Sequence, residues 1–116
     1  MELKLSDFGL SCKLADRQER RTDLCGTPNY LAPEQLLSSK TGHSLAVDMW
    51  ALGVLIYTCL YGVFPFTGKN QGFDELRLNI IDVRYGFPSE PAVSNHAKDL
   101  IGRLLVKDEW KRLKVD

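Results

Sequence analysis

The stretch LAVDMWALGVLIYTCLY, residues 45–61, is apolar on nearly every face when it is written as a helix. Such a helix of about 17 residues would be roughly 25 Å long. A helix that is apolar all round belongs in a protein core. The apolar run from Met49 to Val63 is shorter than the roughly 20 residues that a membrane span needs, and it contains the polar side chains of Tyr57, Thr58 and Tyr61. We therefore expect a buried central helix in a folded domain.

Weaker helical patterns surround this stretch. Residues 32–37 can form a short helix with Pro33 in its first turn, where proline is tolerated. Ser94 is a candidate N-cap for a clean amphipathic helix. Apolar residues with helical spacing are Phe73, Leu76 and Ile80 in one segment, and Ala97, Leu100, Ile101, Leu104 and Leu105 in the other.

The part of the chain before residue 32 has a different pattern. Leu3 to Ser6 alternates apolar and polar residues and predicts a short strand. From about Leu10 to Tyr30 there is no sustained period, which indicates a long surface loop, and such loops are uncommon unless they are functional or disordered. The sequence therefore predicts a mainly α fold with one short strand near its start.

Composition narrows the range of partners. The 116 residues suit one small domain, and an apolar content of 44% is ordinary for a globular chain. The 15 basic and 15 acidic side chains cancel, so neither nucleic acid nor a membrane is expected as a partner. Three cysteines without a CxxC pair are typical of a reduced, intracellular chain, and we expect a cytoplasmic location.

Four short motifs occur in a definite order. Asp7-Phe8-Gly9 opens a segment that closes at Ala32-Pro33-Glu34, with the run CGTPNYL directly before the closing motif. DMWALG follows at residues 48–53, and LLVKDEWKR follows at residues 104–112. Together they resemble the DFG, APE, DxWxxG and LLxxDPxxR motifs of protein kinases, with Glu109 in place of the usual proline.

The resemblance covers the whole chain and implies the C-terminal lobe of the protein kinase fold. Residues 1–116 would then form a partial kinase domain, with an activation segment at 7–34 and a helical lobe at 35–116. The implied activity is transfer of the ATP γ-phosphoryl group to Ser or Thr of a protein substrate. Within the family, the calcium/calmodulin-dependent group fits best, above all the catalytic (γ) subunit of phosphorylase kinase, and polo-like kinases come second. Calmodulin or regulatory subunits are therefore implied as possible partners.

The resemblance also implies roles at the nucleotide and substrate sites. Asp7 matches the carboxylate that holds Mg²⁺ against the phosphates of ATP. Phe8 would pack to set the active or inactive arrangement, and Gly9 would give the backbone the freedom for that change. Thr27 matches the position that supports the substrate hydroxyl in Ser/Thr kinases; a plain turn residue is the alternative.

Asp23 stands where many relatives carry a phosphorylated threonine. A phosphate there adds about −1.5 to −2 charge and docks on an arginine cluster to order the loop. The carboxylate of Asp23 would supply part of that charge permanently, so we expect an enzyme that needs no phosphorylation of this loop. Thr22 keeps the contrary reading open, because a shift of one residue would restore a phosphorylation site.

Three further residues are expected to support the lobe. Glu34 and Arg112 match the family's structural ion pair, which brings the end of the activation segment against the last helices. Asp48, at the start of the apolar helix, should not be buried without a partner. In relatives, this residue accepts backbone hydrogen bonds from the catalytic loop.

The chain contains no glycine-rich loop, no strand lysine with its helix glutamate and no HRDxxxxN catalytic loop. We therefore expect that it is catalytically incompetent by itself, that it binds Mg²⁺ and ATP only weakly, and that it needs the N-terminal half of a kinase as a partner. The alternative is a non-catalytic binding module derived from a kinase, in the manner of a pseudokinase or a dominant-negative fragment.

Overall fold

A computed structural model describes residues 1–23, 25–37 and 42–115 of the chain. In these residues the secondary structure is helical, as expected from the sequence. The elements, in chain order, are η1 (Pro28–Tyr30), α1 (Pro33–Leu37), α2 (Ala46–Tyr61), η2 (Lys69–Gln71), α3 (Phe73–Ile81) and α4 (Asn95–Leu104). The prediction of a mainly α fold is confirmed.

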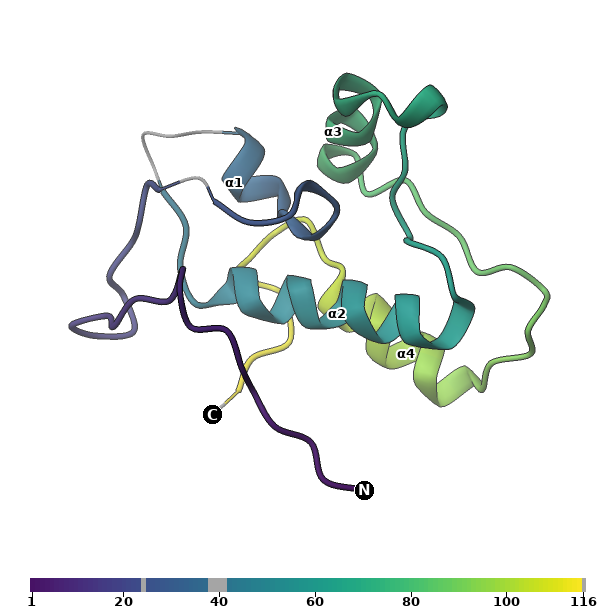
Figure 1. Cartoon of the computed structure of the whole chain (residues 1–116), viewed down its shortest axis with the longest axis horizontal. Coiled ribbons are helices and arrows are strands. Elements are labelled where there is room, and N and C mark those ends of the chain that lie inside the picture. The colour runs from purple at the N-terminus through teal and green to yellow at the C-terminus, as the bar shows by residue number, and fades with distance from the viewer. Residues whose placement is uncertain (24, 38–41, 116) are drawn as a thin grey trace.

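Helix α2 is the central element, and the sequence placed it to within one residue. Figure 1 shows α1 and α3 on one side of α2 and α4 on the other. The buried residues of α2 are Trp50, Gly53, Val54, Tyr57 and Tyr61. Leu52, Leu55 and Leu60 of the same helix are exposed. Within the described residues, α2 is therefore buried along one side, although its composition predicted burial all round.

Helix α4 packs against α2 through a very close contact. The Ser94 side chain caps α4 by accepting a hydrogen bond from the Ala97 N–H at 3.2 Å, as predicted. A Cβ atom at Gly53 would lie 2.8 Å from Leu104 Cβ and 2.9 Å from Leu105 Cδ2. Only glycine lets the two helices approach this closely, because real Cβ atoms do not make such short contacts.

Helices α1 and α3 pack against each other on the opposite side of α2. Pro33 begins α1, and the Gln35 side chain accepts a hydrogen bond from the Ala32 N–H at 2.9 Å, which satisfies one of the free donors at the helix start. Arg77 of α3 donates to the carbonyl of Leu36 at 3.2 Å. Pro33 and Glu34 of the closing motif thus belong to a packed helix.

Aromatic rings join these helices in one core. Trp50 of α2 stacks on Phe66, with ring centroids 5.4 Å apart and an interplanar angle of 13°. Tyr57 of α2 donates its hydroxyl to the Gly86 carbonyl at 2.6 Å, so that the segment after α3 is held against α2. Leu76 and Ile80 of α3 and Ile101 of α4 complete this core cluster. The lobe therefore has one core, built around α2.

The strand predicted for Leu3 to Ser6 is wrong for the described chain, because residues 1–8 carry no secondary structure. The side chains of Leu3 and Leu5 are 90% and 89% exposed. An alternating pattern becomes a strand only when a neighbouring strand accepts its backbone hydrogen bonds, and the described residues offer none at this point. Figure 1 shows the purple N-terminal segment running away from the helices.

The long loop predicted for residues 10–30 is present up to η1, and an isolated bridge between Arg21 and His43 holds it. The sequence also predicts a loop at residues 38–42, because serine, threonine and glycine interrupt the apolar pattern there, and this stretch lies, apart from Gly42, outside the described residues. Among the described residues, no helix is both long and apolar enough to cross a membrane.

Candidate functional site

The Asp7-Phe8-Gly9 motif leads into a tight turn, residues 8–11, on the exposed N-terminal segment. Both the backbone N–H and the hydroxyl of Ser11 donate to the Phe8 carbonyl, at 3.1 and 2.6 Å. Asp7 has a φ angle of 63°, which is uncommon for a residue other than glycine. Strained backbone of this kind costs about 1–3 kcal/mol and is concentrated at functional sites. The sequence placed the conformational freedom at Gly9, whereas the structure places the left-handed residue at Asp7.

The metal role predicted for Asp7 can be compared with its surroundings. The described part of the chain contains no group of three or more His, Cys, Asp or Glu side chains that could hold a metal ion. Mg²⁺ at phosphate sites is usually bound through one or two carboxylates together with phosphate oxygens and water. The exposed carboxylate of Asp7 fits one such position. The other ligands of the metal ion would have to come from a nucleotide and from residues other than those that the structure describes.

Thr27 lies at the start of η1, next to a hollow in the surface. Its carbonyl accepts a hydrogen bond from the Tyr30 N–H at 3.0 Å, and its side chain makes no capping hydrogen bond to this helix. The neighbouring hollow has a volume of about 460 Å³ and lies between the end of the activation segment and α3. Its lining includes Pro28, Asn29, Phe64, Phe73 and Leu76. The exposed threonine thus stands beside a partly apolar hollow that could receive a peptide.

Thr22 and Asp23 are exposed in the middle of the activation segment. Asp23 Oδ2 accepts a hydrogen bond from Nη2 of Arg21 at 2.9 Å. This hydrogen bond raises the pKa of the Arg21 guanidinium above its ordinary value. The partner found for Asp23 is therefore the neighbouring Arg21, in an exposed pair, and pairs of this kind contribute little to stability.

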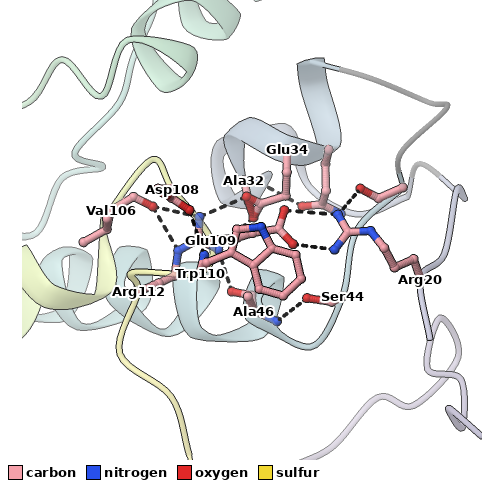
Figure 2. A network of polar contacts seen from close by, with 12 residues as sticks. Arg20, Ala32, Glu34, Ser44, Ala46, Val106, Asp108, Glu109, Trp110 and Arg112 are labelled. Atoms are coloured by element: carbon pink, nitrogen blue, oxygen red, sulfur yellow. Dashed lines mark hydrogen bonds and ion pairs between the residues drawn. The ribbon is translucent and has the colours of Figure 1, made fainter. Parts of the chain in front are cut away.

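Glu34 and Arg112 form the best-developed ion pair of the site, shown in Figure 2. Nη1 of Arg112 donates to Glu34 Oε1 at 2.7 Å, and Nη2 donates to Oε2 at 2.9 Å. The exposed fractions of the two side chains are 0% for Arg112 and 10% for Glu34. A buried, bidentate arginine–carboxylate pair fixes both distance and orientation. The pair joins α1, at the end of the activation segment, to the C-terminal segment.

Arg112 has other hydrogen-bond partners besides Glu34. It also donates to the carbonyls of Val106, at 3.0 and 2.8 Å, and of Ala46 at the start of α2, at 2.7 Å. Its guanidinium carbon lies 5.1 Å from the centroid of the Trp50 ring. Arg112 therefore joins α1, α2 and the C-terminal segment at one point.

Asp48 is exposed in the first turn of α2, where a negative charge is favourable beside the positive end of the helix dipole.

One polar pair at this site was not anticipated from the sequence. Glu109 is buried, with 8% of its surface exposed, and its carboxylate accepts two hydrogen bonds from Arg20 in the activation segment. The one available signal was the replacement of the usual proline by a glutamate in the last motif. The partner could not be read from the sequence, because residues 20 and 109 lie far apart in the chain.

The structure therefore brings the predicted residues Glu34 and Arg112 together, next to the added pair Arg20–Glu109 (Figure 2). The guanidinium of Arg112 also lies over the Trp50 ring. Residues 1–13, which include the Asp7 motif, are exposed and are not part of this buried cluster. In this helical lobe, a buried ion pair binds the end of the activation segment to the C-terminal turn. This is the arrangement that the resemblance to the C-terminal lobe of protein kinases implies.

Comparison with known proteins identifies the class. The family model for the protein kinase domain matches residues 1–116, so the chain belongs to the protein kinase family. It is 45% identical over 116 residues to the probable serine/threonine-protein kinase CCRP1 of Zea mays, covering 100% of this chain and 18% of that protein. It is 46% identical over 112 residues to the serine/threonine-protein kinase Aurora-2 of Arabidopsis thaliana, covering 97% and 37%.

A third relative belongs to the polo-like kinases. The chain is 40% identical over 116 residues to the serine/threonine-protein kinase PLK4 of Aedes aegypti, covering 100% of this chain and 14% of that protein. All three relatives are serine/threonine kinases by name, and the chain spans well under half the length of each.

Proposed function

We propose that this chain is part of a serine/threonine protein kinase that transfers the γ-phosphoryl group of ATP to a hydroxyl group of a protein substrate. One observation carries the proposal: the buried Glu34–Arg112 pair holds the end of the activation segment, inside a chain that matches the kinase domain along its whole length. The similarity to named serine/threonine kinases supports the choice of acceptor.

The residues of this chain would contribute positioning and one charge. Mg²⁺ and ATP, when bound, supply the phosphoryl group and neutralise the charge that develops during its transfer. Asp7 would hold the metal. Thr27 would support the substrate hydroxyl, and the hollow lined by Pro28, Phe73 and Leu76 would receive part of the substrate chain. Phe8 and Gly9 would set the orientation of Asp7.

We further propose that residues 1–116 are catalytically incompetent alone and act together with the N-terminal half of a kinase domain. Two measurements test this: the melting temperature with and without Mg·ATP, and phosphate transfer to a mixture of Ser/Thr peptides. For the chain alone we expect neither a shift nor transfer. In a full-length kinase that carries this segment we expect both, and both should be lost in Asp7→Asn but kept in Asp82→Asn.

The variant Asp82→Asn is the control because it removes an exposed carboxylate from another part of the lobe. Transfer by the full-length kinase that survives Asp7→Asn would contradict the metal role. A full-length protein that transfers no phosphate but still binds a peptide would favour the alternative, a kinase-derived binding module.

We also propose that Asp23 supplies a permanent charge in place of a phosphate. The variant Asp23→Asn keeps the size of the side chain and removes the charge that pairs with Arg21. In a full-length kinase treated with phosphatase, we expect kcat/KM to fall about three- to tenfold, which corresponds to roughly 0.7–1.4 kcal/mol, the net contribution of one ordinary hydrogen bond, because the pair is exposed. The matched control is Asp99→Asn, which removes a similarly exposed carboxylate from an ion pair with Arg103 at the same distance, 2.9 Å. An unchanged kcat/KM in Asp23→Asn would rule out the proposal that the charge of Asp23 replaces a phosphate.

The finer assignment concerns the subgroup. The motif resemblance favours the calcium/calmodulin-dependent group, and the comparisons include polo-like and Aurora kinases. We propose a cytoplasmic kinase of the calcium/calmodulin-dependent group, with a polo-like kinase as the second candidate. Addition of Ca²⁺-calmodulin to the full-length kinase tests the choice: a rise in activity favours the first group, and no response favours the second.

A further inference from the structure

A second arginine–carboxylate bridge crosses from the activation segment to the C-terminal turn. Nη1 of Arg20 donates to Glu109 Oε1 at 2.6 Å, and Nη2 donates to Oε2 at 3.2 Å. The side chains are 27% and 9% exposed, so the pair is shielded much better than the surface pairs of this lobe. A fork of this kind restricts the orientation of both partners. Figure 2 shows Arg20 reaching across to Glu109 next to the Glu34–Arg112 pair.

Further contacts fix Arg20 and Arg21 against Gly42, His43 and Trp110, and we call this set of contacts the seat of the loop. Its Nη2 also donates to the Gly42 carbonyl at 2.7 Å, and its guanidinium carbon lies 5.5 Å from the centroid of the Trp110 ring. The next residue, Arg21, exchanges two backbone hydrogen bonds with His43, at 2.8 and 2.7 Å. A Cβ atom at Gly42 would lie 2.6 Å from the Arg21 carbonyl oxygen, so this approach requires glycine. Backbone and side-chain contacts thus hold residues 20 and 21 at one place.

The seat lies on the same C-terminal turn that binds Glu34. Glu109 and Arg112 belong to the same C-terminal turn, in which Asp108 accepts hydrogen bonds from the Trp110 and Lys111 N–H groups. Arg20 is bound to Glu109, and Glu34 is bound to Arg112. The stretch between residues 20 and 34 is therefore a loop fixed at both ends on one turn. Thr22, Asp23 and Thr27 all lie within it.

We propose that Arg20 and Glu109 are positioning residues, whose bridge holds the activation segment in place without a phosphate. The proposal rests on the kinase function proposed above. The pair is a property of this sequence, because a proline at position 109, as in the motif that this stretch resembles, has no carboxylate to bind Arg20. The exposed Asp23–Arg21 pair lies inside the loop, whereas the Arg20–Glu109 pair closes it.

The test compares four variants of a full-length kinase that carries this segment, after phosphatase treatment. Arg20→Gln and Glu109→Gln each remove one side of the bridge. The double variant Arg20→Glu with Glu109→Arg exchanges the charges. Arg103→Gln is the control, because it removes an exposed ion pair from the outer face of α4. The quantities measured are KM for the protein substrate and KM for ATP.

We expect each single variant to raise KM for the protein substrate about tenfold, the loss of a charged hydrogen bond, and to leave KM for ATP within about twofold. The charge-exchanged variant should recover part of this loss, because it restores the ion pair but not the hydrogen bond to the Gly42 carbonyl, and the control should change neither constant. A general structural weakening would raise both constants and would not be reversed by exchanging the charges. An unchanged KM for the protein substrate in both single variants would overturn the proposal.

A second measurement separates this proposal from the kinase assignment. Amide hydrogen exchange of the same proteins reports whether residues 19–23 and 42–43 are held. We expect faster exchange there in Arg20→Gln and Glu109→Gln, and the normal rate in Arg103→Gln. If the protein transfers no phosphate, the proposed function fails, while faster exchange in the two variants still demonstrates the bridge. Unchanged exchange overturns the bridge whatever the activity.

Discussion

At the scale of single residues, Arg112 organises the site. Its five N–H donors are all used, two on Glu34, two on the Val106 carbonyl and one on the Ala46 carbonyl. A guanidinium has five donors in a planar fork, so no other side chain could make this set of contacts. The face of the group lies against Trp50. Arg112 therefore joins parts of the chain that are far apart in the sequence and leaves no donor unpaired.

Replacement of this arginine should be costly for that reason. In Arg112→Leu, the carboxylate of Glu34 is left nearly buried without its partner, and we expect the free energy of unfolding to fall by about 3–5 kcal/mol. Arg112→Lys should also destabilise, because an ammonium group has three donors and no fork. Urea unfolding of the same chain measures both variants.

The controls for Arg112 are internal to the chain. Arg103→Leu breaks an exposed pair on α4 and should cost less than about 1 kcal/mol. The double variant Glu34→Leu with Arg112→Leu removes both charges and should be more stable than Arg112→Leu alone. Equal losses in Arg112→Leu and Arg103→Leu would contradict the central role of Arg112.

At the scale of elements, the contact between α2 and α4 depends on one missing side chain. The backbone of Gly53 lies against Leu104 and Leu105, too close for a methyl group. Gly102, on α4 itself, has open space where its Cβ would be. The two glycines are both inside helices, yet only the first serves packing. An all-round apolar run predicted α2 and helical spacing predicted α4, but the closeness of their contact became visible only in the packed lobe.

The two glycines therefore offer a matched pair of substitutions. In Gly53→Ala, the added methyl group forces α2 and α4 apart, and we expect a loss of about 1–3 kcal/mol in the free energy of unfolding. In Gly102→Ala, the methyl group enters solvent and improves helix propensity, with a gain of roughly 0.5–1 kcal/mol. Thermal unfolding followed by circular dichroism distinguishes the two. A Gly53→Ala protein as stable as the original would show that the helices can separate at no cost.

At the scale of the whole molecule, the described residues cover only one side of the central helix. Leu52, Leu55 and Leu60 of α2 are exposed, although this helix was expected in a core. Apolar residues gathered on one exposed helix favour association when they form a large patch. We therefore expect the chain alone to be marginally stable and to associate.

Sedimentation velocity over a range of concentrations tests this expectation. The sedimentation coefficient should rise with concentration for the original chain, and the rise should diminish in the double variant Leu52→Glu, Leu55→Glu. Leu78→Glu, at an exposed position of α3, is the control and should leave the association unchanged. A monomer at all concentrations with a cooperative melt would contradict the expectation.

The sequence alone determined the helices, their order and the family. Local rules, such as helical spacing, the Ser94 cap and Pro33 in a first turn, act over a few residues and survive without knowledge of the rest of the chain. The strand at Leu3 to Ser6 failed for the opposite reason, because a strand depends on a distant partner. The motif order also identified Glu34 and Arg112, although their distance and their burial could not be known.

Only the tertiary structure decided which side of α2 is covered, how closely α4 approaches it and which charges meet. Arg20 and Glu109 are 89 positions apart, and nothing local distinguishes Arg20 from the other arginines of its loop. Burial next to Trp110 and Gly42 selects that one pairing, because a shielded carboxylate requires a partner that can donate to both of its oxygens. The physical reason is that helices are encoded over a few residues, whereas an ion pair between distant segments exists only after the chain has packed.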